Sequence, residues 1–250
     1  MIQSLVKLTI TMTAAVLLVA CGPRGNEPEA QEQAAGPAAA PPDSVAQRAP
    51  VRVRADGSYP VRPLEKDVIV LKVVQNGVRN LQDFPSVEEG LKHNLEAMVS
   101  WAEKACSEGM PPDFILFNEF PLTGYSSGTR EEKLKFTIEI PGPETERLGE
   151  VARDCDSYIV FGSYASDPAW PGHILSINSV IGRDGELARK FWKSRSVKRL
   201  NPGTEIPTTT IENVRDRYRD RYGIEEEFPV LQTEYGNIAV STVQLDPFVY

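Results

Sequence analysis

Apolar, β-branched runs of strand length alternate with helix-like segments through the middle of this 250-residue chain. The run Asp67–Gln75 is almost continuously apolar, which is typical of a strand buried on both faces. Similar runs lie at 114–117 and 158–164. Because helical patterns separate these runs, we expect a layered α/β fold with a mixed sheet.

Two amphipathic helices are predicted between these strands. Ser86 and Glu89 form a capping-box pattern where the first helix begins, and Gly109 with the prolines after it ends that helix. The second helix spans about 144–155. Their core-facing stripes contain Val87, Leu91, Leu95, Met98, Ala102 and Cys106 in the first helix and Leu148, Val151 and Ala152 in the second.

Hairpins dominate the second half of the chain. Strands at 177–181 and 187–191 flank Arg183-Asp184-Gly185, a strong hairpin signal. Residues 204–210 are predicted to be a loop, and 211–222 a polar helix ended by Gly223. A last strand pair is predicted at 228–232 and 237–243, so the β-rich second half completes the mixed sheet.

The N-terminal 63 residues carry targeting features. Lys7 precedes an uncharged apolar run over 8–20, shorter than the roughly 20 residues that cross a membrane. Residues 1–20 are therefore predicted to be a cleaved signal peptide. The sequence Leu18-Val19-Ala20-Cys21 resembles a bacterial lipobox, which implies that Cys21 carries a lipid. Residues 21–63 are predicted to be a disordered tether before a folded domain over 64–250.

These N-terminal features predict a protein held at a bacterial membrane from outside the cytoplasm. Gly22, in place of an aspartate after the lipidated cysteine, favours the periplasmic face of the outer membrane. We therefore expect the membrane to be one partner of the protein, bound through the lipid on Cys21. Nucleic acid is excluded as a partner, because the net charge is −8 and no basic stripe is present.

Cys106 and Cys155 remain once Cys21 is assigned to lipid. In an oxidising compartment they could form a disulfide, but two buried free thiols fit the sequence equally well. His93 and His173 are the two histidines of the chain, and no Cys/His cluster is present. Neither a zinc site nor any cofactor is therefore expected.

Several segments, in order, resemble the nitrilase, or carbon–nitrogen hydrolase, superfamily. The strand ending at Gln75 matches the first strand of the family, and 113–125 looks like the strand and loop that present its catalytic glutamate. Residues 140–162 are similar to the next helix and strand, 178–193 to the hairpin that ends at the catalytic lysine, and 235–240 to the strand before the nucleophile. The resemblance implies an αββα sandwich with mixed sheets, incomplete at the C-terminus because family members continue beyond Tyr250.

The resemblance also implies a Glu-Lys-Cys triad that cleaves small amides or nitriles, with no cofactor. Glu119 matches the general base and acid, and Lys193 matches the cation that stabilises charge in the transition state. Asn118 stands where the family usually has a proline, and Glu205 is the nearest candidate for a second acidic residue. We expect the two charged side chains of the triad to point into one cavity.

The third member of the triad is missing. Counting from Gly236 places the nucleophile at Val243, counting from Asp246 places it at Gln244, and counting back from Tyr250 places it at Leu245. None of these side chains can form the covalent intermediate of the family. Asp246 is a conceivable but poorer carboxylate nucleophile.

Three functions remain as alternatives. The first is a membrane-anchored carbon–nitrogen hydrolase with a variant nucleophile, and the second is a pseudoenzyme that binds an amide-like ligand or a partner protein. The third, an unrelated structural lipoprotein, would make Glu119 and Lys193 ordinary surface charges. Trp170 and Trp192 either line a substrate pocket or belong to the core. The family resemblance also implies a possible homodimer.

Overall fold

The computed structural model describes residues 55–56, 58, 60–125, 129–196 and 207–242. The predicted signal peptide, most of the tether with Cys21, and Glu205 lie outside the described residues. The same holds for the three counted nucleophile positions, Val243, Gln244 and Leu245. Within the described ranges, no helix combines the length and apolarity needed to span a membrane.

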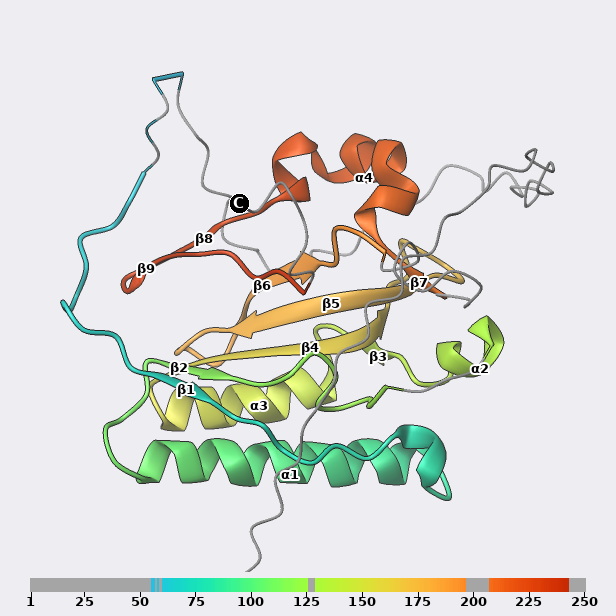
Figure 1. Ribbon diagram of the computed structural model, residues 1–250, viewed down its shortest axis with the longest axis horizontal. Coiled ribbons are helices and arrows are strands. Elements are labelled where there is room, and N and C mark those ends of the chain that lie inside the picture. Colours follow the sequence, from blue (N-terminus) through green and yellow to red (C-terminus); the bar gives the residue numbers. More distant parts are fainter. Residues whose placement is uncertain (1–54, 57, 59, 126–128, 197–206, 243–250) are drawn as a thin grey trace, which may run out of the picture. The chain divides into compact units, whose positions relative to one another are not determined.

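A mixed, seven-stranded sheet forms the centre of the domain (Figure 1). Its main path contains β1 (Leu71–Val73), β2 (Phe114–Leu116), β4 (Tyr158–Ser166), β5 (Ile174–Ile181) and β6 (Leu187–Trp192). Strands β1, β2 and β4 are parallel, whereas β4, β5 and β6 are antiparallel. Two short strands, β3 (Ile138–Glu139) and β7 (Thr208–Thr209), pair in parallel with β4 and β5. The predicted α/β fold with a mixed sheet is confirmed.

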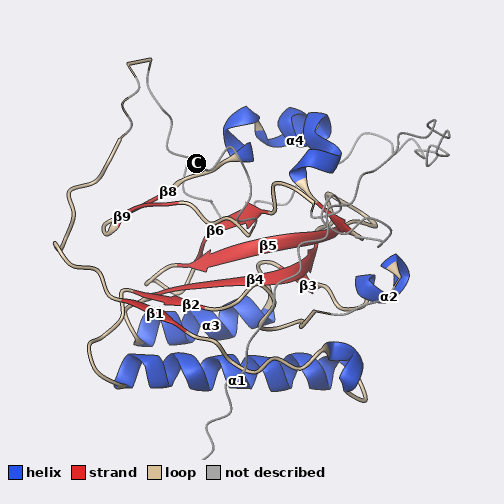
Figure 2. Ribbon diagram, in the orientation of Figure 1, coloured by secondary structure: helices blue, strands red, loops and turns tan. Residues whose placement is uncertain are grey.

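Helices α1 (Val87–Ser107) and α3 (Pro143–Asp154) cover one face of this sheet (Figures 1 and 2). The Ser86 hydroxyl caps α1 by accepting a hydrogen bond from the Glu89 backbone N–H at 3.2 Å. Apart from Val87, the residues of both predicted stripes are confirmed as members of the larger core or as partly buried residues packed against it. That core includes Met98, Ala102, Leu148, Val151, Ala152, Ile159, Phe161, Leu175 and Ile177.

The opposite face of the sheet packs against a small antiparallel sheet of β8 (Leu231–Thr233) and β9 (Gly236–Ile238). A smaller apolar core fills this interface and includes Phe114, Tyr158, Val160, Val180, Phe191, Leu231 and Tyr235. Helix α4 (Arg215–Tyr222) lies on the same side in Figure 1. The order of helices, sheet and second sheet is that of the predicted sandwich.

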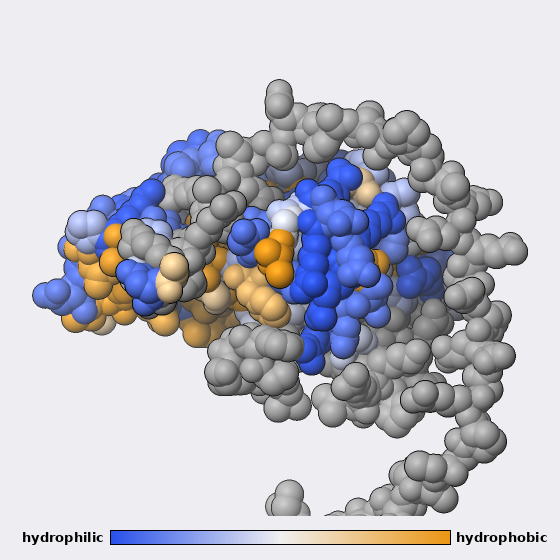
Figure 3. Space-filling view, turned by 90° about the horizontal axis from the view of Figure 1, so that it is seen from above, coloured by the Kyte–Doolittle hydropathy of each residue, from blue (hydrophilic) through white to orange (hydrophobic). Residues whose placement is uncertain are grey.

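The surface over α4 is hydrophilic, as the blue atoms in Figure 3 show. The helix carries four arginines and two aspartates, and Tyr218 is its one buried residue. The prediction of a polar helix is therefore confirmed, with one change. Residues Ile211–Val214 form a 3-10 turn before α4, which ends at Gly223 with φ 92°.

Strand β1 corrects a prediction. The run 67–75 contains only three strand residues, and one of its faces is open rather than buried. Leu71 and Val73 are 59% and 76% exposed, so no described segment covers their face of the strand. Strand β1 is also the edge strand of the sheet. In addition, α2 (Arg130–Leu134) and β3 lie where no element is predicted, although Thr129 and Glu132 form a capping box.

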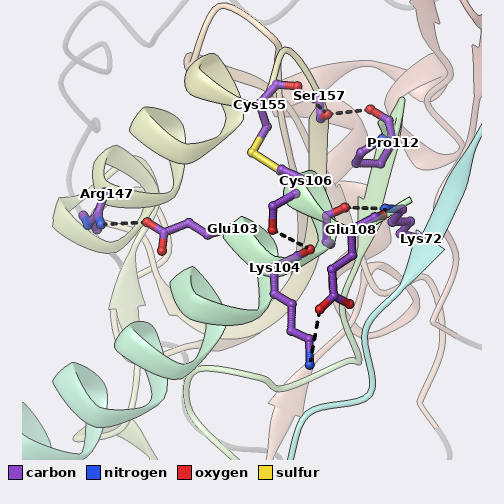
Figure 4. The surroundings of a disulfide bond; sticks show 11 residues. Lys72, Glu103, Lys104, Cys106, Glu108, Pro112, Arg147, Cys155 and Ser157 are labelled. Atoms are coloured by element: carbon purple, nitrogen blue, oxygen red, sulfur yellow. Dashed lines mark hydrogen bonds and ion pairs between the residues drawn. A yellow bond between two sulfur atoms is a disulfide. The ribbon is translucent and has the colours of Figure 1, made fainter. Parts of the chain in front are cut away.

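Cys106 and Cys155 form a disulfide (Figure 4). The bond joins the end of α1 to the residue that follows α3, with 5.7 Å between the two Cα atoms. Beside it, the Ser157 hydroxyl donates a hydrogen bond to the Pro112 carbonyl oxygen at 2.6 Å. Of the two alternatives that the sequence leaves open, the structure has the disulfide.

Candidate functional site

Glu119 and Lys193 meet over the face of the sheet opposite α1 and α3. Glu119 lies in the loop after β2, and Lys193 directly follows β6, so β4 and β5 lie between the two strands that carry them. The Lys193 Nζ donates a hydrogen bond to Glu119 Oε1 at 3.0 Å. The lysine side chain is 12% exposed and the glutamate side chain 35%. The structure thus brings the two predicted site residues together, with the carboxylate the more accessible of the two.

Gly162 allows the backbone of Glu119 to lie directly against β4. A Cβ atom built on this β4 glycine would lie 2.1 Å from the Glu119 carbonyl oxygen, which is too close for two such atoms. The Gly162 N–H also faces the Asn118 carbonyl oxygen at 3.4 Å. The loop after β2 therefore rests directly on β4, and this brings the Glu119 side chain toward β5 and β6.

Asn118 orders the loop that it shares with Glu119. Its Oδ1 accepts a hydrogen bond from the Phe120 backbone N–H at 3.1 Å, the pattern of an Asx turn. Its Nδ2 donates to Asn76 Oδ1 at 3.4 Å. The asparagine that departs from the family pattern therefore has a structural role of its own in this chain.

The backbone of Lys193 is held from two sides. Its N–H donates to the Ser176 carbonyl oxygen at 2.9 Å, and its carbonyl oxygen accepts from the Ile211 N–H at 3.1 Å. In the same β5–β6 ladder, Asn178 pairs with Phe191. Because opposite residues of an antiparallel pair share a face, Ser176, Asn178 and Lys193 lie on one face.

This register continues into β4, where Gly162 pairs with Asn178 and Tyr164 with Ser176. The surface beneath the Glu119–Lys193 pair, called the site floor below, thus consists of Gly162, Tyr164, Ser176 and Asn178. Tyr164, Ser176 and Asn178 are all at least 95% buried. None of the four is predicted as a site residue from the sequence. The available signal was the polar residues at alternate positions of the apolar run 174–181.

Tyr164 connects the loop to the site floor. Its ring stacks on that of Phe120, with the ring centroids 4.2 Å apart. Burial raises the pKa of Tyr164 well above its ordinary value, and Tyr125 and the Glu119 carboxylate raise it further. The phenol therefore stays protonated at neutral pH. The ammonium of the buried Lys133 lies 5.6 Å from the same ring centroid.

Asn178 carries the one amide nitrogen of the site floor. Its Nδ2 is buried and has no hydrogen-bond partner among the described residues. A Cβ atom added to Gly162 would lie 3.0 Å from the Asn178 Oδ1. The same added atom would be too close to the Glu119 carbonyl oxygen. The Asn178 amide therefore lies against β4, beside the backbone of Glu119.

A cavity of about 250 Å³ opens beside the strand end that precedes Lys193. Phe191, Trp192 and Ser194 line one side, and 228–230 with 239–242 line the other. Glu119 and Lys193 do not line this cavity, so the expectation that both side chains point into one cavity is not met by it. The Thr242 Oγ1, next to the counted position 243, is buried without a hydrogen-bond partner among the described residues.

The sequence leaves open whether Trp170 and Trp192 line a pocket or belong to the core, and the structure gives a different answer for each. Trp170 is 1% exposed and belongs to the larger core, where its Nε1 donates to the Tyr222 hydroxyl at 3.0 Å. Trp192 packs against Trp170, with the ring centroids 5.2 Å apart, and it also lines the cavity. Within the described ranges, no group of three or more His, Cys, Asp and Glu side chains is placed to hold a metal ion.

The sequence matches the family described as "Carbon-nitrogen hydrolase" over residues 77–244. It is similar to omega-amidase NIT2 of Homo sapiens, with 36% identity over 59 residues, which cover 24% of this chain and 21% of that protein. The omega-amidase NIT2 of Xenopus tropicalis is 27% identical over 106 residues, 42% of this chain and 34% of that protein. The matched segments thus span about a fifth to a third of these relatives.

Solved structures are similar to parts of this chain. A double mutant of the amidase from Nesterenkonia sp. AN1 in complex with acrylamide is 16% identical, with a TM-score of 0.48 and coverage of 70% of this chain and 55% of that one. A carbon-nitrogen hydrolase from Helicobacter pylori G27 is 14% identical, with a TM-score of 0.46 and coverage of 57% and 45%, respectively.

Proposed function

This chain belongs to the carbon–nitrogen hydrolase family, and from that premise we propose that it hydrolyses non-peptide C–N bonds of small amides or nitriles. The observation that carries the proposal is the contact of 3.0 Å between Lys193 Nζ and Glu119 Oε1, made by side chains from separate strand ends. Surface ion pairs are common and contribute little to stability. This pair instead lies over a buried polar floor, where polar groups are costly unless they are hydrogen-bonded, and the Asn178 Nδ2 has no partner there among the described residues.

The two charges have different roles in the proposed reaction. Glu119 takes a proton from the attacking group and returns it to the leaving amine. Lys193 stabilises the negative charge that develops on the substrate as the tetrahedral intermediate forms. The backbone hydrogen bonds of Lys193 to Ser176 and Ile211 fix the strand end that carries this cation.

The nucleophile decides between activity and binding alone. Val243, Gln244 and Leu245 carry no thiol or hydroxyl group, so a covalent intermediate at these positions is not part of the proposal. In the route we propose, a water oxygen bonds to the amide carbon and gives its proton to Glu119. The C–N bond then breaks as the amine takes that proton, and the products are a carboxylic acid and ammonia.

A second candidate function is a pseudoenzyme that keeps the site and binds an amide-like ligand or a partner protein. The absence of Cys, Ser and Thr from positions 243–245 favours this function. In that case the Glu119–Lys193 pair and the site floor bind a ligand without cleaving it.

We also propose that the protein is anchored by lipid on Cys21 at the periplasmic face of an outer membrane, with 21–63 as the tether. The Cys106–Cys155 disulfide supports a location outside the cytoplasm, since disulfides persist in oxidising compartments. Metabolic labelling with a palmitate analogue tests the anchor: label and membrane association should both disappear in Cys21→Ala. A homodimer is proposed from the family resemblance, and sedimentation velocity tests it.

Ammonia release from acetamide and propionamide tests the hydrolase function in the full-length protein. We expect Glu119→Gln and Lys193→Met each to reduce release by at least about 100-fold. The control Glu96→Gln changes an exposed carboxylate on α1, which lies on the side of the sheet opposite the Glu119–Lys193 pair. This variant should leave ammonia release unchanged.

Other outcomes of this assay separate the candidates. Binding of the amides without release supports the pseudoenzyme, and release gained on installing cysteine at Val243, Gln244 or Leu245 would strengthen it. Neither binding nor release by the wild-type protein would overturn the hydrolase and the pseudoenzyme that binds an amide-like ligand.

A further inference from the structure

Two buried polar atoms on neighbouring residues of β5 have no hydrogen-bond partner among the described residues: Asn178 Nδ2 and Ser179 Oγ. They point to opposite sides of the sheet, because successive side chains of a strand alternate. Ser179 lies on the same face of β5 as Ile177 of the larger core. Helices α1 and α3 pack against this face. Asn178 belongs instead to the site floor, so only its unsatisfied donors are placed to meet a ligand of the site.

The position of Asn178 relative to both charges follows from the strand register. Asn178 pairs with Gly162 on one side and with Phe191 on the other. Lys193 is two residues beyond Phe191, which makes it a diagonal neighbour of Asn178, typically about 7–8 Å away. On the other side, the Asn178 amide lies close to the Glu119 backbone, because Gly162 between them has no side chain.

An amide nitrogen that is buried with free N–H groups is costly unless an acceptor fills the space beside it. The lysine ammonium offers only donors, the protonated tyrosine hydroxyl can donate as well as accept, and the Asn178 Nδ2 adds two more donors. Donors from several sides match a ligand oxygen or nitrogen that accepts, such as the oxygen of a carbonyl group.

We propose that the side-chain N–H₂ of Asn178 binds substrate by donating a hydrogen bond to the carbonyl oxygen of an amide that lies over the site floor. This inference rests on the proposed function, because it assumes that the site accepts small amides. It adds a specificity: ligands with a strong acceptor oxygen are bound in preference to isosteres with a weak one. The nitrogen end of the amide is left toward Glu119, where the leaving amine takes its proton.

Replacing oxygen by sulfur in the ligand tests this hydrogen bond directly. Sulfur is a weak acceptor, so the full-length wild-type protein should bind propionamide about tenfold more tightly than thiopropionamide in calorimetric titrations. Asn178→Leu keeps the side-chain size but removes the donors, and this variant should bind the two ligands with nearly equal affinity. The control Ser179→Ala, on the opposite face of β5, should keep the tenfold ratio.

A measurement on the unaltered protein covers the case in which Asn178→Leu fails to fold. The side-chain ¹H–¹⁵N resonances of Asn178 should shift on addition of propionamide and shift much less with thiopropionamide. Unchanged resonances, or a variant that keeps the oxygen-over-sulfur ratio, would overturn the inference while leaving the proposed function intact. A wild-type protein that binds neither ligand would instead overturn the proposed function, and the inference with it.

Discussion

The two faces of the central sheet are built from the same strands but bury different chemistry. Toward α1 and α3, β4 and β5 present mostly large apolar side chains, among them Ile159, Phe161, Leu175 and Ile177, with the small residues Ser163 and Ser179 between them. On the opposite face the middle of these strands is the site floor, and apolar packing against β8 and β9 is confined to the smaller core. The face toward α1 and α3 therefore stabilises the fold, whereas the face with the site floor buries polar groups in place of apolar ones.

This contrast teaches that stability and binding should be separable by mutation. Removing apolar volume from the helix-facing side should lower the free energy of unfolding and leave ligand affinity in the surviving folded protein unchanged. Changes in the site floor should mainly lower ligand affinity or activity, with a smaller cost in the free energy of unfolding. The predictions below test this separation, from the largest expected effect to the smallest.

Neighbouring residues of β5 provide the strongest test. Ile177→Ala should lower the free energy of unfolding by about 2–5 kcal/mol, because a 2%-exposed side chain leaves a cavity in the larger core. Ser176→Ala, on the opposite face, should cost about 1 kcal/mol or less. Urea denaturation measures both values. Similar costs for the two variants would contradict the contrast between the faces.

Removing the disulfide should act on stability alone. The double variant Cys106→Ser, Cys155→Ser should lose about 2–4 kcal/mol of unfolding free energy, because the bond closes a loop with a sequence separation of 49. Amide affinity should not change, since the bond lies at the helix ends. Wild-type protein unfolded in the presence of a reductant should match the double variant, and any loss of affinity would contradict the separation.

Gly162→Ala should affect the site more than the stability. The new methyl group would displace the Glu119 carbonyl oxygen and thereby lift the loop away from Lys193. We expect amide affinity or ammonia release to fall at least about tenfold, for a cost of roughly 1–3 kcal/mol in stability. Gly77→Ala, where no atom lies within 4 Å of the added carbon, is the matched control and should change neither quantity.

The smallest effect is expected from the charges that fasten the β8–β9 turn to the main sheet. Arg183 donates to Glu234 Oε1 at 2.8 Å and to Asp156 Oδ2 at 2.6 Å. Burial acts to raise the pKa of Glu234, but hydrogen bonds from Arg183, the backbone and Tyr158 bring it below its ordinary value of 4.5. The Arg183 hydrogen bond likewise lowers the pKa of Asp156.

A carboxylate whose pKa is lowered by folding stabilises the fold above its ordinary pKa, and this contribution disappears as the pH falls through the lowered value. We therefore expect the free energy of unfolding to decrease below pH 4.5, the ordinary value for Glu234. Urea denaturation between pH 7 and pH 3 should show a shallower decrease in Arg183→Met. An equal decrease in both proteins would rule out these carboxylates as its source.

The parts of the fold that could be predicted depend on local signals. The β5–β6 hairpin followed from the turn at Arg183–Gly185, and α1 followed from its cap and apolar stripe. The exposure of β1 and the pairing of Cys106 with Cys155 could not be predicted, because both depend on which distant segments pack together. The same tertiary dependence left the disulfide open as one of two alternatives.

The candidate site was predicted only where its residues match a family motif. Glu119 and Lys193 follow strands that could be recognised, and the structure brings them into contact. Gly162 and Asn178 lie within segments that resemble the family, but the resemblance assigns them no role in the site. Their importance depends on a cross-strand register that one sequence does not provide. A polar residue inside an apolar strand was nevertheless visible, and it marks a position that deserves a test for ligand contact.

The disulfide has a consequence for how damage to this protein can be detected. Its two half-cystines enclose 107–154, the stretch that contains Glu119 and the loop around it. A protease that cuts once inside this stretch leaves two fragments still joined by the sulfur–sulfur bond. Such nicked molecules would migrate as full-length on a gel without reductant and separate into two bands only after reduction.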